Sequence, residues 1–393
     1  MATMNLSSSP PWVRMAIGGS SALFVGMGLG RFSYAPMIPI LIEENALSPA
    51  EAGYVGAFNL AGFLFGVVLQ PALRAQIGER GTLRLCLSTS LACLVASAAP
   101  LTAPWLFPWL AFLRGLIGIA VGTIMVQALA VATRTAPPDK LGLVTGIVFS
   151  GVGGGIFLSG IAIPALLDQG LTATWIGVAV IGAGAVAVGL WAYAGPIPEA
   201  TAPKSKSSSP IPFWSLTTRL AAAQSLFVIG LIPHTIFWVD YIVRGLHHPM
   251  AIGGTHWALF GLGALVGPAL WGRLADQIGF HAGLILVFAT LAIGLFAPVI
   301  HPVMGILVAS SFVVGAQPGC SALLSGRTQQ IFGNEGMSKV WRHMTLIGSI
   351  GQGLGGYLLV ALFDATGSYA TIFLIGSAAM AGGAVISATI RQD

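Results

Sequence analysis

The stretch Gly272-Arg273-Leu274-Ala275-Asp276-Gln277-Ile278-Gly279 places two charged side chains between two long apolar runs. Only 7% of the 393 residues are Asp, Glu, Lys or Arg, so an Arg and an Asp three residues apart, framed by glycines, are unusual in this chain. On a helix that ends at Gly279, Arg273 and Asp276 lie on the same face. The apolar runs on either side decide the fold class.

The composition indicates a membrane protein. Hydrophobic residues make up 55% of the chain, and the mean hydropathy is +0.87. Soluble domains carry roughly 25% charged residues, so this chain cannot cover a soluble surface. A spanning helix needs about 20 apolar residues, which leaves room for roughly a dozen spans. The net charge of +5 is better explained by membrane orientation than by nucleic-acid binding.

Hydrophobic runs and breakers predict an all-α protein with twelve spans in two sets of six. The first set lies near 14–41, 50–73, 81–100, 103–133, 140–167 and 172–194, and the second near 216–243, 252–275, 280–299, 301–329, 338–364 and 368–389. A stretch rich in Pro and Ser separates them. We therefore expect an N-terminal bundle (1–195), a linker (196–215) and a C-terminal bundle (216–393).

Charge placement predicts the orientation of the spans. The even-numbered connections hold most of the cations: Arg74, Arg80, Arg84, Arg134, Lys140, Lys204, Lys206, Arg219, Arg273, Arg327, Lys339 and Arg342. The odd-numbered connections hold mostly acids (Glu43, Glu44, Glu51, Asp168 and Asp364), with Arg244 as the lone Arg. By the positive-inside rule, both termini and the linker lie in the cytoplasm.

The two sets of spans also resemble each other. Leu73-Arg74-Ala75-Gln76-Ile77-Gly78 matches Leu274-Ala275-Asp276-Gln277-Ile278-Gly279 in four of six positions. The ends of the fifth and eleventh spans, around Asp168 and Asp364, match at a similar offset of about half the chain. Two six-helix bundles related by an internal repeat are typical of secondary transporters.

The octapeptide resembles the G-x-L-a-D-x-x-G loop of major facilitator superfamily (MFS) transporters. The resemblance implies two six-helix bundles related by a pseudo-two-fold repeat. It also implies a cytoplasmic gate at Gly272, Arg273, Asp276 and Gly279, where the Asp caps a helix across the bundle interface. The first copy departs from the pattern, because Ala75 replaces the Asp and Pro71 replaces the first Gly.

The fourth span contains Arg114-Gly115-Leu116-Ile117-Gly118-Ile119-Ala120, which resembles the R-x-x-x-G-x-G/A signature of the same superfamily. In the family this Arg is associated with proton coupling. A cation inside an apolar helix is costly, so Arg114 should face the bundle interior. The alternative is an interfacial Arg near the start of the span whose side chain snorkels to the membrane surface.

The first span carries Arg31 well inside its apolar run, with Tyr34 one turn away on the same face. The guanidinium is always charged and offers a planar fork of donors to carboxylate or phosphate. We expect Arg31 to bind an anion, the alternative being a structural charge pair. Gly28-Leu29-Gly30-Arg31-Phe32-Ser33-Tyr34 also resembles the YbfB/YjiJ-type branch of the superfamily.

The seventh span is the repeat partner of the first. His234, Trp238 and Tyr241 lie at i, i+4 and i+7, and an offset near 203 places His234 opposite Arg31. We expect this stripe, with Asn59 of the second span, to contribute to substrate binding. His234 could couple to protons or simply pack in the core. Asp240 could also couple to protons, or it could form an ion pair with Arg244, which lies four residues later.

These features together predict a secondary active transporter in the plasma membrane, with the bacterial inner membrane as the expected site. It would move a small solute, favoured as an organic anion, and couple to protons by alternating access. Its partners would be that solute, protons and lipid, without nucleic acid, metal or cofactor, and we expect a monomer. A membrane-embedded enzyme and a non-transporting sensor are the alternatives. Residues 351–356 fit G-x-G-x-x-G, but no strand precedes them.

Overall fold

The computed structural model describes residues 10–137, 140–195, 197 and 215–390, and every regular element in these ranges is a helix. The first half comprises α1 (Pro11–Leu23), η2 (Phe24–Arg31), η3 (Phe32–Met37), α2 (Ile38–Glu43), α3 (Pro49–Ala96), α4 (Leu106–Thr135), α5 (Leu141–Leu167) and α6 (Leu171–Ala192). The second comprises α7 (Leu216–Gly230), η5 (Pro233–Phe237), α8 (Trp238–Asp240), η6 (Tyr241–Gly245), α9 (Met250–Ile278), α10 (Phe280–Ile300), α11 (Met304–Gly315), α12 (Pro318–Thr366) and α13 (Tyr369–Ala388).

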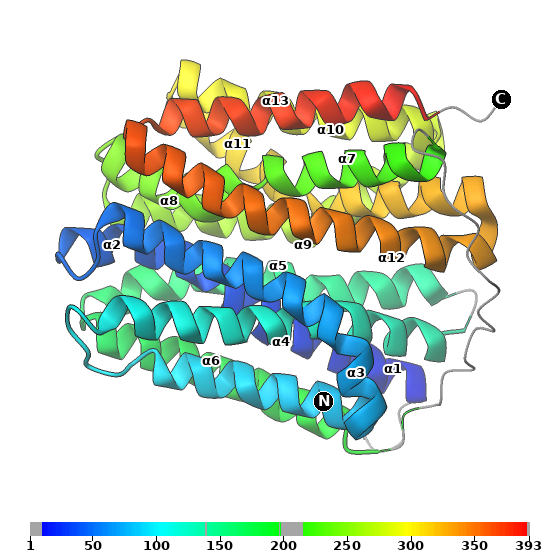
Figure 1. Ribbon diagram of the computed structural model, residues 1–393, viewed down its shortest axis with the longest axis horizontal. Helices are drawn as coiled ribbons and strands as arrows, with labels where there is room; N and C mark the ends of the chain where they lie inside the picture. Colours follow the sequence, from blue (N-terminus) through cyan, green and yellow to red (C-terminus); the bar gives the residue numbers. More distant parts are fainter. Residues whose placement is uncertain (1–9, 138–139, 196, 198–214, 391–393) are drawn as a thin grey trace, which may run out of the picture.

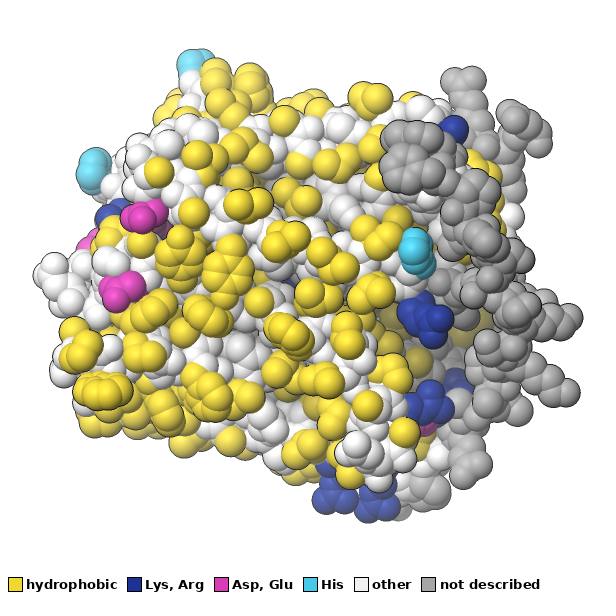
Figure 2. All heavy atoms as spheres, in the orientation of Figure 1, with side chains coloured by type: hydrophobic (Ala, Val, Ile, Leu, Met, Phe, Trp, Pro, Cys, Tyr) yellow, Lys and Arg dark blue, Asp and Glu magenta, His cyan; other side chains and the backbone are white. Residues whose placement is uncertain are grey.

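Eleven helical segments in the described ranges are long and apolar enough to cross a membrane. Apolar side chains cover much of the face of the molecule that Figure 2 shows. Val180, Leu358 and Val385, for example, are 66%, 68% and 68% exposed. Such a surface is unfavourable in water but matches the hydrocarbon core of a bilayer. The all-helical membrane fold expected from the sequence is therefore confirmed.

The turn at the end of the second predicted span explains why eleven segments are found instead of twelve. The helix α3 is 48 residues long, but its backbone leaves helical geometry at Gly78, with φ 70° and ψ 172°. The predicted spans 50–73 and 81–100 lie on the two sides of this break. Gly279, the repeat partner of Gly78, has φ 84° and ψ 150° between α9 and α10. Both conformations are accessible essentially only to glycine. The two halves therefore share this backbone conformation as well as the repeated sequence.

The helices form two groups, α1–α6 and α7–α13, which Figure 1 shows one above the other. The groups touch mainly where α5 packs on α9 and α3 packs on α12. Gly160, Gly254 and Gly261 sit so close to the facing backbone of the α5–α9 contact that none has room for a Cβ. Small residues therefore allow the two groups to approach each other at backbone distance.

The two ends of the molecule differ in charge and in packing. At one end, here called the termini end, Lys140 lies over the Trp12 ring, and Arg219 bonds to the carbonyl of Thr389. Lys and Arg gather at this end and Asp and Glu at the opposite end (Figure 2). The helices α3 and α12 diverge toward the termini end (Figure 1). The predicted linker falls on residues 196–215, of which 196 and 198–214 lie outside the described residues.

Candidate functional site

The first span does not run as one regular helix. After α1, the backbone passes through the π-helix η2 and then the 3-10 helix η3, which contains Pro36, before α2 begins. Gly28 and Gly30 allow this path, because a Cβ on Gly28 would lie 2.7 Å from the Cα of Gly155, and one on Gly30 would lie 2.8 Å from Ile117. Arg31 is the last residue of the π-helix. Local unwinding of this kind is frequent at functional sites.

Arg31 has no hydrogen-bond or ion-pair partner among the described residues. The side chain is half-buried, and its guanidinium lies over the rings of Phe32 and Phe63, 5.1 and 5.8 Å from their centroids. Aromatic faces stabilise a cation without using its N–H groups. The N–H donors of Arg31 are therefore free, and the structural charge pair considered from the sequence is not formed.

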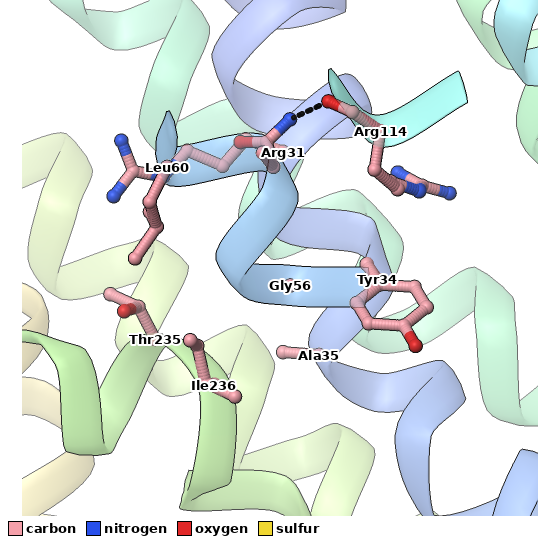
Figure 3. A pocket seen from close by; sticks show the side chains of 9 residues that line it. Arg31, Tyr34, Ala35, Gly56, Leu60, Arg114, Thr235 and Ile236 are labelled. Atoms are coloured by element: carbon pink, nitrogen blue, oxygen red, sulfur yellow. Dashed lines mark hydrogen bonds between the residues drawn. The ribbon is translucent and has the colours of Figure 1, made fainter. Parts of the chain in front are cut away.

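A small cavity adjoins Arg31 in the interior of the molecule (Figure 3). It measures about 20 Å³, which is enough for about one water molecule. The first group of helices contributes most of the wall, and Thr235 and Ile236 of η5 close it from the second group. The lining residues are Arg31, Tyr34, Ala35, Gly56, Asn59, Leu60, Arg114, Thr235 and Ile236. None of these carries a carboxylate, so the cavity is cationic.

Arg114 also lines the cavity, but its side chain is held inside the first group of helices. It is 0% exposed, and its Nη1 donates to the carbonyl of Gly30 at 2.6 Å. Its guanidinium lies over the rings of Tyr34 and Trp175, 5.0 and 4.8 Å from their centroids, while Nε and Nη2 have no partner. Complete burial contradicts the alternative in which Arg114 snorkels to the membrane surface.

Comparison with known protein families identifies the family of this chain. Residues 23–388 match the family model described as uncharacterised MFS-type transporter YbfB. The chain belongs to this family of MFS transporters. The match covers almost the whole chain, so the resemblance seen in Gly28–Tyr34 and in the 272–279 loop is confirmed.

Solved structures share the fold of this YbfB-type chain. The crystal structure of a D-xylose-proton symporter has a TM-score of 0.72 and 15% identity, covering 96% of both chains. An inward-facing, unoccupied bacterial homologue of the human lysosomal transporter Spinster has a TM-score of 0.64 and 14% identity, covering 98% of this chain and 97% of that one. At these identities the likeness establishes the MFS fold alone.

A benzoate transport protein of Acinetobacter baylyi is a curated relative of the YbfB-type chain. The two are 25% identical over 154 residues, which is 37% of this chain and 32% of the relative. The match thus spans about a third of the relative's length.

The stripe His234, Trp238 and Tyr241 of this YbfB-type chain does not line the cavity with Arg31. His234 stacks on Trp238 at 4.2 Å and shares a hydrogen bond of 3.0 Å with Ser310. Tyr241 donates to the carbonyl of Pro298 at 2.9 Å. The seventh span passes through two π-helices, η5 and η6, so the face expected from regular helical spacing turns into the second group.

The polar cluster that contacts this stripe could not be predicted from the sequence. Ser311 accepts a hydrogen bond from Nε1 of Trp238 at 3.0 Å and shares one with Nδ1 of His256 at 2.8 Å. Ser310 in addition donates to the carbonyl of Gly294 at 2.7 Å. Serine is common inside membrane helices, and its partners come from helices distant in sequence, so only the folded structure reveals the cluster.

Asp240 lies at the opposite end of the molecule from the termini. Its carboxylate pairs with Arg244 at 3.2 Å, as the i, i+4 spacing suggested, and accepts a hydrogen bond of 2.5 Å from Tyr369. Aspartate at this depth is buried and satisfied by partners from its own group of helices. Asp240 belongs to the same span as Thr235 and Ile236, which line the cavity.

The predicted gate at Gly272, Arg273, Asp276 and Gly279 lies at the termini end. Asp276 is exposed and makes no hydrogen bond or ion pair with any described residue. The first half contains the ion pairs instead, because Glu79, directly after Gly78, pairs with Arg74 at 3.1 Å and with both terminal nitrogens of Arg134. The sequence analysis missed Glu79, since it lies four positions after Ala75, the residue that occupies the Asp position of the motif.

Proposed function

We propose that this protein is a secondary active transporter of a small organic anion, driven by protons, in the plasma membrane. Family membership supports the transporter class. The main support for an anionic substrate is the guanidinium of Arg31, which has no partner and lies beside a cavity without carboxylates. The relative described as a benzoate transport protein points the same way. A bound carboxylate would supply the hydrogen bonds that Arg31 lacks.

The proposed cycle is a rocking of two bundles, residues 1–195 and 216–393, around the cavity. We take α3 as two spans, broken at Gly78, and we count α11 with the part of α12 up to Gly333 as one span and the rest of α12 as the next, which gives twelve in all. The lysines and arginines of the termini end support a cytoplasmic position for that end, by the positive-inside rule. We infer that the described conformation faces inward, because α3 and α12 diverge toward that end (Figure 1).

Closure of the opposite end supports the same assignment. Tyr357 of α12 packs against Tyr54 and Phe58 of α3, with ring centroids 5.9 and 5.7 Å apart. Phe32 of η3 packs against Trp257 of α9 at 6.2 Å. These contacts between the bundles are apolar, so they can separate without leaving buried charges unpaired. Alternating access requires that such contacts break and re-form in each cycle.

Proton coupling is assigned to Arg114, His234 and Asp240. Arg114 lies over the Tyr34 ring, and Asp240 belongs to the span that closes the cavity from the second group, so a proton on Asp240 would change the field at the cavity wall. His234 is buried and bonded to Ser310, which makes it the least accessible of the three. Transfer of a proton through such a group requires opening of the bundle core. In this scheme a proton and the anion move in the same cycle.

The experiment is uptake of radiolabelled benzoate into proteoliposomes with and without an inward proton gradient. We expect the gradient to drive accumulation, and Arg31→Gln to lower uptake by at least about 30-fold, since it removes the charge that pairs with the carboxylate. Arg84→Gln is the matched control, because Arg84 is an exposed cation of α3. It should transport like the wild type.

Two results would contradict the proposal. Uptake that is indifferent to the proton gradient would exclude proton coupling. Uptake or binding of anions that is equal in the wild type and in Arg31→Gln would remove Arg31 from the site. A loss of uptake shared equally by Arg84→Gln would indicate a general effect of surface charge instead of a specific anion site.

A further inference from the structure

The polar side chains of the cavity differ in what they can still offer to a ligand. Tyr34 donates its hydroxyl proton to the carbonyl of Ala52 at 2.9 Å. Thr235 donates its hydroxyl proton to the carbonyl of Ile232 at 3.2 Å. Each hydroxyl has a single proton to donate. Neither Tyr34 nor Thr235 is therefore a free donor for a substrate.

Asn59 presents an unused acceptor at the cavity wall. Its Nδ2 donates to the carbonyl of Arg114 at 3.0 Å. Because a carbonyl oxygen can only accept, this contact fixes which end of the amide is NH2. The other end, Oδ1, is buried and has no hydrogen-bond partner. A buried acceptor of this kind is unfavourable unless a ligand or a water donates to it.

Only one of the two arginines is free to bind a carboxylate in the cavity. Figure 3 shows the Arg31 side chain extending past Leu60, while the Arg114 side chain turns the other way, toward Tyr34. Arg114 is held there by its bond to Gly30 and by the Tyr34 and Trp175 rings. Nε and Nη2 of Arg114 have no partner, but a second carboxylate could pair with them only by displacing this guanidinium from the Tyr34 and Trp175 rings. The geometry thus favours a single negative charge.

The remaining wall is apolar. The side chains of Ala35, Leu60 and Ile236 are apolar, and Gly56 has no side chain. A sugar or another polyol would bury several hydroxyl groups beside this apolar surface, where few of them would find a hydrogen-bond partner. An apolar or aromatic group loses no hydrogen bonds when it packs against this part of the wall.

We infer that the cavity, which must widen from the volume of about one water molecule to admit a substrate, selects a monocarboxylate with an apolar body that carries one hydrogen-bond donor, a hydroxyl or an N–H, on the side facing Asn59. The carboxylate pairs with Arg31, and the donor fills the free position on Oδ1 of Asn59. This inference rests on the proposed function, because it concerns the same site. It adds the charge of the substrate, the character of its body and one required substituent.

The test is direct binding to the purified full-length protein in detergent, measured by titration calorimetry. The probes are benzoate, its three hydroxy isomers, phthalate as a dianion and xylose as a neutral polyol. We expect the best hydroxybenzoate to bind about five- to tenfold more tightly than benzoate, which is the usual effect of one satisfied buried hydrogen bond. Phthalate and xylose should bind at least tenfold more weakly than benzoate.

Asn59→Leu should reduce the preference for the hydroxyl to less than twofold, with benzoate itself weakened no more than about threefold. Thr235→Val is the matched control and should keep the full preference, because the Thr235 proton is already used within its helix. The ratio between two ligands is measured within one variant, so a general loss of affinity cancels. Should Asn59→Leu not fold, the wild-type ratios decide the question.

The inference is overturned if every hydroxybenzoate binds no better than benzoate, if phthalate binds best, or if Asn59→Leu keeps the preference. In those cases proton-driven uptake of an anion could still stand. If binding is selective as expected but uptake ignores the proton gradient, the coupling in the proposed function fails and the assigned substrate class holds.

Discussion

The two halves of this protein unwind at matching places but stabilise the unwound backbone with different chemistry. In the first half, η2 and η3 interrupt the first span, and Arg114 of α4 bonds to the carbonyl of Gly30. In the second half, η5 and η6 interrupt the seventh span, and Ser310 and Ser311 of α11 bond to side chains of that span. Both α4 and α11 are the fourth span of their half.

This difference indicates that the first half binds the ligand, whereas the second half stabilises the fold. The first half contains two buried or half-buried guanidinium groups whose N–H donors are partly unused. The second half contains a cluster of histidine, tryptophan and serine side chains that bond mainly to one another; Nδ1 of His234 has no partner, but none of these side chains lines the cavity with Arg31. Unused donors can bind a ligand, whereas satisfied groups stabilise the fold. We therefore expect changes in the first half to affect transport and changes in the second to affect stability.

The largest expected effect is on transport by Arg114→Met. Proton-driven uptake should be abolished, because the cation that acts on Tyr34 and anchors Gly30 is lost. The free energy of unfolding should change by less than about 1 kcal/mol, since apolar replacement of a buried charge with unmet donors is often nearly neutral. Uptake in proteoliposomes and thermal unfolding in detergent measure the two effects.

Arg114→Lys tests whether charge alone is enough. Lysine retains the charge but lacks the planar fork that reaches Gly30 while lying on two rings. We expect it to restore only part of the uptake. A strong loss of stability with intact uptake in Arg114→Met would reverse the roles assigned to the two halves.

The second effect is on stability, by Ser311→Ala. This change leaves Nε1 of Trp238 and Nδ1 of His256 without their partner in a buried site. Each unsatisfied buried group costs about 1–3 kcal/mol, so we expect a loss of about 2–4 kcal/mol in unfolding free energy. Ser387→Ala is the control, because the Ser387 hydroxyl is buried without a partner, and it should change stability by less than about 0.5 kcal/mol. Equal losses in both variants would argue against a structural cluster.

The sequence predicted those features that depend on patterns along the chain. Apolar runs gave the spans, and the match between Leu73–Gly78 and Leu274–Gly279 gave the repeat, which Gly78 and Gly279 carry into the backbone with positive φ angles. The burial of Arg31 and Arg114 followed from charges inside long apolar helices. These features need no knowledge of which helices touch.

The sequence failed where the backbone leaves regular geometry. Regular spacing of 3.6 residues per turn predicts that the stripe of His234, Trp238 and Tyr241 contributes to substrate binding, but in a span with two π-helices His234 and Trp238 bond to Ser310 and Ser311. Thr235 and Ile236, which line the cavity, lie next to His234 in sequence and could not be singled out. Asn59 was one of several polar residues within spans, and its contact with Arg114 depends on the packing of α3 on α4.

The smallest effects are expected from substitutions in the two copies of the loop at the termini end. Glu79 pairs with Arg74 and Arg134 within the first half, whereas Asp276 has no partner among the described residues. Glu79→Gln should lower the free energy of unfolding by about 1 kcal/mol, and the loss should shrink at high salt, because the pairs are partly exposed and screened. Asp276→Asn should change it by less than about 0.3 kcal/mol.

Thermal unfolding of both variants at low and high salt makes this comparison. An equal, salt-dependent loss in Asp276→Asn would mean that Asp276 has an ionic partner in detergent solution, as the family motif implies for the closed gate. A loss confined to Glu79→Gln would mean that the ionic contacts at this end hold α3 and α4 together inside the first half. The inward opening between the halves would then cost no ion pair, because no described pair spans it.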